Sequence, residues 1–107
     1  MPQQRQRRNT PRRQVAIDLT LDRPRGNPIT GHTVDVGGGG MKIITTRPLA
    51  VDEVLFFHLP IPAKSGKPVD GRARVLREAA LNTYALRFED LDAHDRLLLS
   101  RFVGEAA

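Results

Sequence analysis

Residues 34 to 43 read VDVGGGGMKI, so four consecutive glycines separate two runs of β-forming residues. The run before them is ITGHTVDV (29–36), and the run after them is MKIITT (41–46). Glycine weakens a regular strand, and it is favoured where the backbone turns sharply or where another group approaches the main chain closely. The stretch therefore predicts two strands joined by a tight turn, and it raises the question of what approaches this turn.

Apolar residues that alternate with polar ones predict four further strands on either side of this pair. These strands lie at residues 15–21, 53–60, 69–78 and 83–90. In the first of them Val15, Ile17, Leu19 and Leu21 share one face. Segments rich in proline, glycine and polar residues separate most of the runs, as expected of turns. The chain is therefore expected to form six short strands.

The last segment of the chain changes from strand spacing to helix spacing. Asp92 is a suitable N-cap residue, and Leu97, Leu98 and Phe102 are expected to pack on the strands. Six short strands followed by one helix are typical of a closed antiparallel barrel, because closure leaves no sheet edge exposed. We expect a mainly β protein: a six-stranded antiparallel β-barrel with a C-terminal α-helix and a flexible, arginine-rich N-terminal arm.

The positive charge of the chain is concentrated in that arm. The net charge is +5, from 17 basic and 12 acidic residues. Residues 1–13 carry five arginines and no acid, so residues 14–107 are neutral overall. The arm is too polar to fold alone, and it is either a solubilising tail or a segment that binds an anion. The expected division is a basic arm at 1–13 and a barrel with its helix at 14–107.

Several classes of function find no support in the sequence. The chain contains no cysteine, and His32, His58 and His94 are scattered, so we expect no metal site, no cofactor and no enzyme activity. The segment GNPITGHT (26–33) has the glycine spacing of a phosphate-binding P-loop, but a strand follows it where a P-loop requires a helix. No apolar run approaches the roughly 20 residues of a membrane span, and no secretory signal is present, so we expect a cytoplasmic protein.

Two short motifs remain, and together they resemble a known family. Residues 8–12 read RNTPR, which has the form R-x-x-x-R, and residues 35–40 read DVGGGG, which is similar to [D/N]-x-S-x-x-G. These motifs, in this order, resemble those of PilZ domains. The segments ARV (73–75) and YALRF (84–88) and the closing helix extend the resemblance to nearly the whole chain.

The resemblance implies a receptor for cyclic di-GMP, a bacterial second messenger with two phosphates and two guanines. By analogy with the family, Arg8 and Arg12 bind guanine edges and phosphates, while Asp35 and the turn from Gly37 to Gly40 bind a base. This fits the chemistry, since arginine can bond guanine O6 and N7, a carboxylate can accept from guanine N–H groups, and glycines admit a flat ligand. Arg7 precedes the first motif arginine, and in this family an arginine there is associated with binding a stacked pair of ligands.

One position departs from the family pattern, because Gly37 stands where the motif has serine. Loss of a hydroxyl that makes one hydrogen bond to the ligand would weaken binding by about 0.5–1.5 kcal/mol.

Three hypotheses for the function remain open. The first is a cyclic di-GMP receptor whose arm folds over the ligand and alters contact with an unidentified effector protein. The second is a PilZ-like adaptor that does not bind nucleotide. The third is a small nucleic-acid-binding barrel, which the neutral body and the few aromatic residues argue against.

Overall fold

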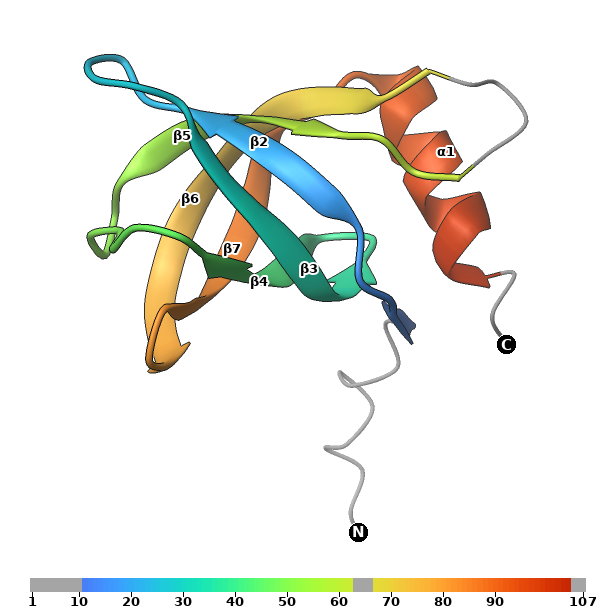
Figure 1. The fold of residues 1–107 in the computed structure, drawn as a ribbon. Coiled ribbons are helices and arrows are strands. Elements are labelled where there is room, and N and C mark those ends of the chain that lie inside the picture. Colours follow the sequence, from blue (N-terminus) through green and yellow to red (C-terminus); the bar gives the residue numbers. More distant parts are fainter. Residues whose placement is uncertain (1–10, 63–66, 105–107) are drawn as a thin grey trace, which may run out of the picture.

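The computed structural model describes residues 11–62 and 67–104 of the chain. Within these residues, seven strands are followed by one helix (Figure 1). The elements are β1 (Arg12–Gln14), β2 (Asp18–Asp22), β3 (Ile29–Gly37), β4 (Gly40–Thr45), β5 (Val54–Leu59), β6 (Val69–Ala80), β7 (Thr83–Asp90) and α1 (Ala93–Gly104). The six expected strands and the expected helix are all present.

The strands close into a barrel in which every pairing is antiparallel. The order around the barrel is β3-β2-β5-β6-β7-β4, and β4 pairs with β3 to complete the circle. Strand β1 is additional and pairs with β3 beside β2. The expected fold class, a six-stranded antiparallel barrel with a C-terminal helix, is confirmed.

The first expected strand, residues 15–21, differs from the structure because residues 15–17 are not part of a strand and separate β1 from β2. Its place is taken by β1 and β2, both paired with β3, so Arg12 and Arg13 lie in a strand although the sequence groups them with the arm. The side chain of Thr33 spans the break. Its Oγ1 accepts a hydrogen bond from the Ile17 amide at 2.9 Å and donates one to the Val15 carbonyl, which satisfies main-chain groups that the ladder leaves unpaired.

The core forms from the inward-facing residues of the alternating strands. Leu21, Val36, Ile43, Leu55 and Phe57 are fully buried, and their neighbours along each strand are more exposed. This alternation is the one that the sequence predicts. The barrel is therefore filled by side chains, and any ligand must bind on its outside.

The packing face of α1 agrees with the expected one at Leu98 and Phe102 and differs from it at Leu97. The residues that are buried are Leu99, Phe102 and Val103, while Leu98 is partly buried. The expectation for Leu97 is wrong, because half of its surface is exposed. Residues two positions apart differ by about 200° around a helix, so a helix that buries Leu99 must turn Leu97 outward. The expected cap is present, with the Asp95 amide donating to Asp92 Oδ1 at 2.8 Å.

Helix α1 lies beside the barrel and contacts β1, β3 and β6 (Figure 1). Arg13 ties β1 to its last turn. The Arg13 Nη1 donates to the Phe102 carbonyl at 2.9 Å, and the guanidinium carbon lies 4.2 Å from the centre of the Phe102 ring. The positive charge of Arg13 is thus attracted both by the negative C-terminal end of the helix dipole and by the face of the Phe102 ring. A change in the position of β1 therefore acts directly on the end of α1.

Candidate ligand site

The glycine run forms the turn between β3 and β4, with Gly38 and Gly39 between the two strands. None of the four glycines has a left-handed φ, and close approach explains Gly37 and Gly40 but not Gly38 or Gly39. A Cβ on Gly37 would lie 2.8 Å from Arg12 Nη1, and a Cβ on Gly40 would overlap the main-chain carbonyl of Leu86 on β7. The groups that approach this turn are thus an arginine side chain on one strand and the backbone of β7.

Residues from the two sequence motifs contact each other in this structure. Arg12 on β1 pairs in register with Gly37, and its guanidinium turns toward Asp35 on β3. Arg12 Nε donates to Asp35 Oδ1 at 2.9 Å, and Arg12 Nη2 donates to the same oxygen. The side chain of Arg12 is 46% exposed and that of Asp35 is 16% exposed, so solvent weakens this ion pair to about 1 kcal/mol at most.

The Arg12–Asp35 pair lies at a basic cleft of about 380 Å³ on the outer surface of β4, β6 and β7. The charged side chains that line the cleft are Arg12, Asp35, Lys42, Arg77 and Arg87. Four cations therefore surround one carboxylate. Such a site suits an anionic ligand that also offers hydrogen-bond donors to a carboxylate.

The structure brings together most of the described residues that the sequence singles out. Arg12, Asp35 and Gly40 line the basic cleft, and Gly37 lies directly behind the Arg12 guanidinium. Arg7 and Arg8 lie outside the described residues, and their roles stay predictions. Two residues 23 positions apart in the chain thus meet at one end of the cleft, and their role in binding a ligand stays a prediction.

Three cations of the basic cleft were missed by the sequence analysis. Lys42, Arg77 and Arg87 lie on β4, β6 and β7, and only the pairing of these strands makes them neighbours. The body is neutral overall, but this face of it is basic. The signal in the sequence was weak: Lys42 and Arg87 each stand between two apolar residues of a strand, which identifies outward-facing positions but not their neighbours.

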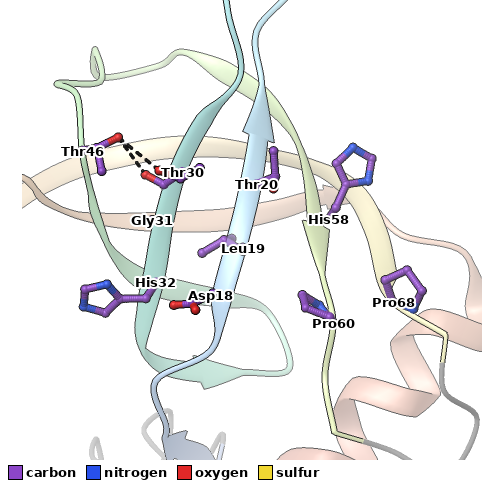
Figure 2. A pocket seen from close by; sticks show the side chains of 10 residues that line it. All are labelled: Asp18, Leu19, Thr20, Thr30, Gly31, His32, Thr46, His58, Pro60 and Pro68. Atoms are coloured by element: carbon purple, nitrogen blue, oxygen red, sulfur yellow. Dashed lines mark hydrogen bonds between the residues drawn. The ribbon is translucent and has the colours of Figure 1, made fainter.

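A second hollow, of about 540 Å³, lies mainly on β2, β3 and β5. Figure 2 shows its lining side chains, which include Asp18, His32 and His58 and the hydrogen-bonded pair Thr30 and Thr46. Among the residues that the structure describes, no lysine or arginine lines this hollow. It is larger than the basic cleft, but its charge makes it the poorer site for a phosphate ligand.

His58, at the edge of the second hollow, is held between two carboxylates. Its ring nitrogens lie 2.9 Å from Asp22 Oδ2 on β2 and 2.9 Å from Asp70 Oδ1 on β6. The hydrogen bond to Asp22, and then that to Asp70, raises the pKa of His58 above its ordinary value of 6.5. Protonated His58 therefore joins three neighbouring strands, which gives it a structural role.

Two absences are observed within residues 11–62 and 67–104. No group of three or more histidine, aspartate or glutamate side chains is arranged to hold a metal ion. The helix in this part of the chain is neither long nor apolar enough to cross a membrane.

Comparisons with known proteins agree with the fold. The solved structure of the inhibitor of motility MotI/DgrA from Bacillus subtilis matches with a TM-score of 0.78 at 18% identity, covering 99% of this chain and 56% of that one. The PilZ domain of CeSA from a cellulose-synthesizing bacterium matches with a TM-score of 0.66 at 17% identity, covering 89% of this chain and 96% of that one. This chain thus spans little more than half the length of the motility inhibitor.

At these identities the structural matches establish a shared fold and nothing finer. A search of curated protein sequences finds no match. The family model described as PilZ domain, however, matches residues 6–105, which is nearly the whole sequence and includes both motifs. The sequence motifs, the closed barrel with its C-terminal helix and the family match agree, and the chain belongs to the PilZ domain family.

Proposed function

We propose that this protein is a cyclic di-GMP receptor that acts as an adaptor. The observation that carries the proposal is the meeting of Arg12 and Asp35, one from each motif, at the end of a cleft lined by three further cations. PilZ domains are a family of cyclic di-GMP-binding adaptors, and this chain has the second motif arginine and the motif aspartate in contact at this position. The receptor reading is therefore favoured over an adaptor that does not bind nucleotide.

The chemistry of the Arg12–Asp35 pair matches one guanine. Guanine offers acceptors at O6 and N7, which suit a guanidinium, and N–H donors at N1 and N2, which suit a carboxylate. The Nε and Nη2 donors of Arg12 are bonded to Asp35, so these donors and this acceptor satisfy each other before a base arrives. Ligand binding then exchanges the bond between the two side chains for bonds from each of them to the base.

The contacts of Arg13 provide a route from the ligand to a partner. Arg13 follows Arg12 on β1, and it bonds the last turn of α1 through Phe102. Movement of Arg12 onto a base shifts β1, and β1 in turn shifts the end of α1. An effector protein that binds the surface of α1 can therefore respond to the ligand. Arg7 and Arg8 contribute to binding of the ligand from the N-terminal segment.

Calorimetric titration with cyclic di-GMP tests the receptor function. We expect Arg12→Ala and Asp35→Asn each to lose about 1–3 kcal/mol of binding free energy, which is about 5- to 150-fold in affinity. Arg25→Ala is the matched control for Arg12→Ala, because it removes the same charge from an exposed turn outside the cleft.

Two results would contradict the proposal in different ways. If the wild-type protein shows no binding at about 100 µM ligand, the proposed receptor function is wrong, and the hypothesis of an adaptor that does not bind nucleotide is favoured. If binding is unchanged in Arg12→Ala and in Asp35→Asn, the protein is a receptor but the site is elsewhere.

A further inference from the structure

The register of the barrel places four outward-facing residues of the basic cleft in one row across four strands. Asp35 on β3 pairs with Lys42 on β4, Lys42 pairs with Ala85 on β7, and Ala85 pairs with Arg77 on β6. Neighbouring strands are about 4.8 Å apart, so the row extends about 14 Å from Asp35 to Arg77. The row continues well beyond the single base that Arg12 and Asp35 can hold.

A bulge in β6 directs two side chains into this row. Val75 pairs with Leu86 and Arg77 pairs with Ala85, which leaves Leu76 as an extra residue without a partner on β7. Val75 is fully buried, while Leu76 and Arg77 are both exposed and both line the cleft. A β-bulge of this kind changes the direction of side chains and is frequent beside binding sites. Here it places an apolar side chain next to a cation.

The middle of the row is hollow because the residue there and a neighbour in the next row are small. Ala85 lies between Lys42 and Arg77, and Gly40 lies beside Arg87 in the next row. A longer side chain on Ala85 would fill the space between the two cations. The cleft is therefore deepest over β7 at Ala85. Leu76 forms an apolar side of it, and Lys42 and Arg77 lie on either side of Ala85.

The two cations of the row are available to a ligand. Arg87 already contacts Glu89, with its Nη2 3.3 Å from Oε2. The side chains of Lys42 and Arg77, by contrast, form no hydrogen bond or ion pair with any residue in the described ranges 11–62 and 67–104. Side-chain cations without a carboxylate partner, beside an apolar wall, are suited to a phosphate that carries a flat base.

We propose that Lys42, Ala85, Arg77 and Leu76 form a second subsite, which binds the phosphate and the second base of a dinucleotide whose first base lies at Arg12 and Asp35. In this subsite Lys42 and Arg77 contact the phosphate, and the base lies over Ala85 against Leu76. The inference rests on the proposed function, because it assigns the other half of the same ligand. It also makes Ala85 a residue that determines specificity, since its small size admits the ring.

The test compares three variants by calorimetry with cyclic di-GMP. We expect Lys42→Ala and Arg77→Ala each to weaken binding by about tenfold, as for the loss of one charge-assisted hydrogen bond. Ala85→Leu is expected to weaken it at least as much by filling the hollow, whereas Ala85→Ser keeps the side chain small and is expected to bind as the wild type does. Circular dichroism of each variant confirms that the barrel is folded. Wild-type affinity in folded Ala85→Leu and in Arg77→Ala would overturn the subsite and leave the proposed function standing.

A second measurement decides the subsite even if cyclic di-GMP does not bind. Backbone amide spectra of the wild-type protein are recorded during titration with 5′-GMP and, separately, with sodium pyrophosphate, at millimolar concentration. Shifts of the Lys42, Leu76, Arg77 and Ala85 amides that disappear in Ala85→Leu with 5′-GMP, and in Arg77→Ala with both probes, support the subsite. Shifts confined to other residues, or no shifts, overturn it.

Discussion

A single added methyl group at Gly37 tests whether the Arg12–Asp35 pair competes with the ligand. A Cβ on Gly37 would lie 2.8 Å from Arg12 Nη1 and 3.3 Å from both Arg12 Cζ and the main-chain oxygen of Pro11. The first distance is too short, but the guanidinium is the end of a flexible side chain and can move, and the contact with Pro11 requires a shift of only a few tenths of an ångström. Because Gly37 does not have a left-handed φ, the backbone accepts alanine. Gly37→Ala should therefore displace Arg12 from Asp35 and leave the hairpin intact.

The size of the effect follows from the exposure of the pair. With Arg12 46% exposed, the ion pair is worth about 0.2–1 kcal/mol. Its loss in the free protein removes a competitor of the ligand, so Gly37→Ala should tighten cyclic di-GMP binding by up to about fivefold. Gly37→Ser adds a hydroxyl as well, and one new hydrogen bond of about 0.5–1.5 kcal/mol would tighten binding a further two- to tenfold. The free energy of unfolding should change little, since alanine also restricts the unfolded chain by about 0.4–1 kcal/mol.

The assay combines calorimetry with the Arg12 Nε–Hε resonance in nitrogen-correlated spectra. In Gly37→Ala this proton should exchange faster with water, because its bond to Asp35 is lost. Gly38→Ala is the matched control, since its Cβ would meet only Ser100 Oγ at an ordinary 4.0 Å. An unchanged Arg12 resonance in Gly37→Ala, or weaker ligand binding, would refute the reasoning. Equal affinities of Gly37→Ala and Gly37→Ser would show that the hydroxyl contributes nothing.

Three further predictions concern stability. Hydrogen bonds to Asp22 and Asp70 raise the folded-state pKa of His58 above 6.5. The contribution of His58 to the free energy of unfolding is therefore complete below pH 6.5 and is lost as the pH rises through the raised pKa. Urea titrations of the wild type and of His58→Gln should differ more at about pH 6 than at about pH 9. Arg13→Ala removes a charged hydrogen bond and a cation–π contact, and it should lower the free energy of unfolding by about 1–2 kcal/mol and speed amide exchange in the last turn of α1. Gly40→Ala drives a methyl group into a main-chain carbonyl of β7, and it should cost about 1–3 kcal/mol in thermal unfolding.

Each of these predictions has an outcome that contradicts it. An equal effect of His58→Gln at both pH values would mean that the histidine is not protonated when held by its carboxylates. Slow exchange at the end of α1 in Arg13→Ala would mean that the helix does not depend on β1. For Gly40, the control is Gly39→Ala, whose Cβ meets nothing within 4 Å, and equal stability of the two variants would refute the steric argument.

The fold was predictable from the sequence because most of its signal is local. Each strand is half buried, so alternation along the chain reports the face that points inward, and the six runs follow from it. Where the signal was not local, the prediction was wrong. A run of three leucines does not say which of them faces the barrel, and the position of α1 selects Leu99 in place of Leu97. The break between β1 and β2 depends on Thr33 from another strand.

The candidate site was predictable only at the end that carries motifs. Arg12 and Asp35 belong to short patterns with a known order, and the structure joins them. The remaining cations of the cleft depend on strand register, which is set by pairings between residues far apart in the chain. The position of Arg77 depends in addition on the β6 bulge, since without the extra residue its side chain would follow the regular alternation.

The closure of the barrel without β1 has a consequence for local unfolding. Six strands complete the circle of hydrogen bonds by themselves, and among the described residues β1 pairs with β3 alone. Detachment of β1 therefore opens a short ladder and exposes little of the core, so its free energy must be far below that of global unfolding. Asp35, in contrast, lies on β3, whose pairings with β2 and β4 belong to the closed barrel and stay in place when β1 detaches. The two motifs thus belong to cooperative units of different stability, and the protein can release one half of its site while it keeps the other half folded.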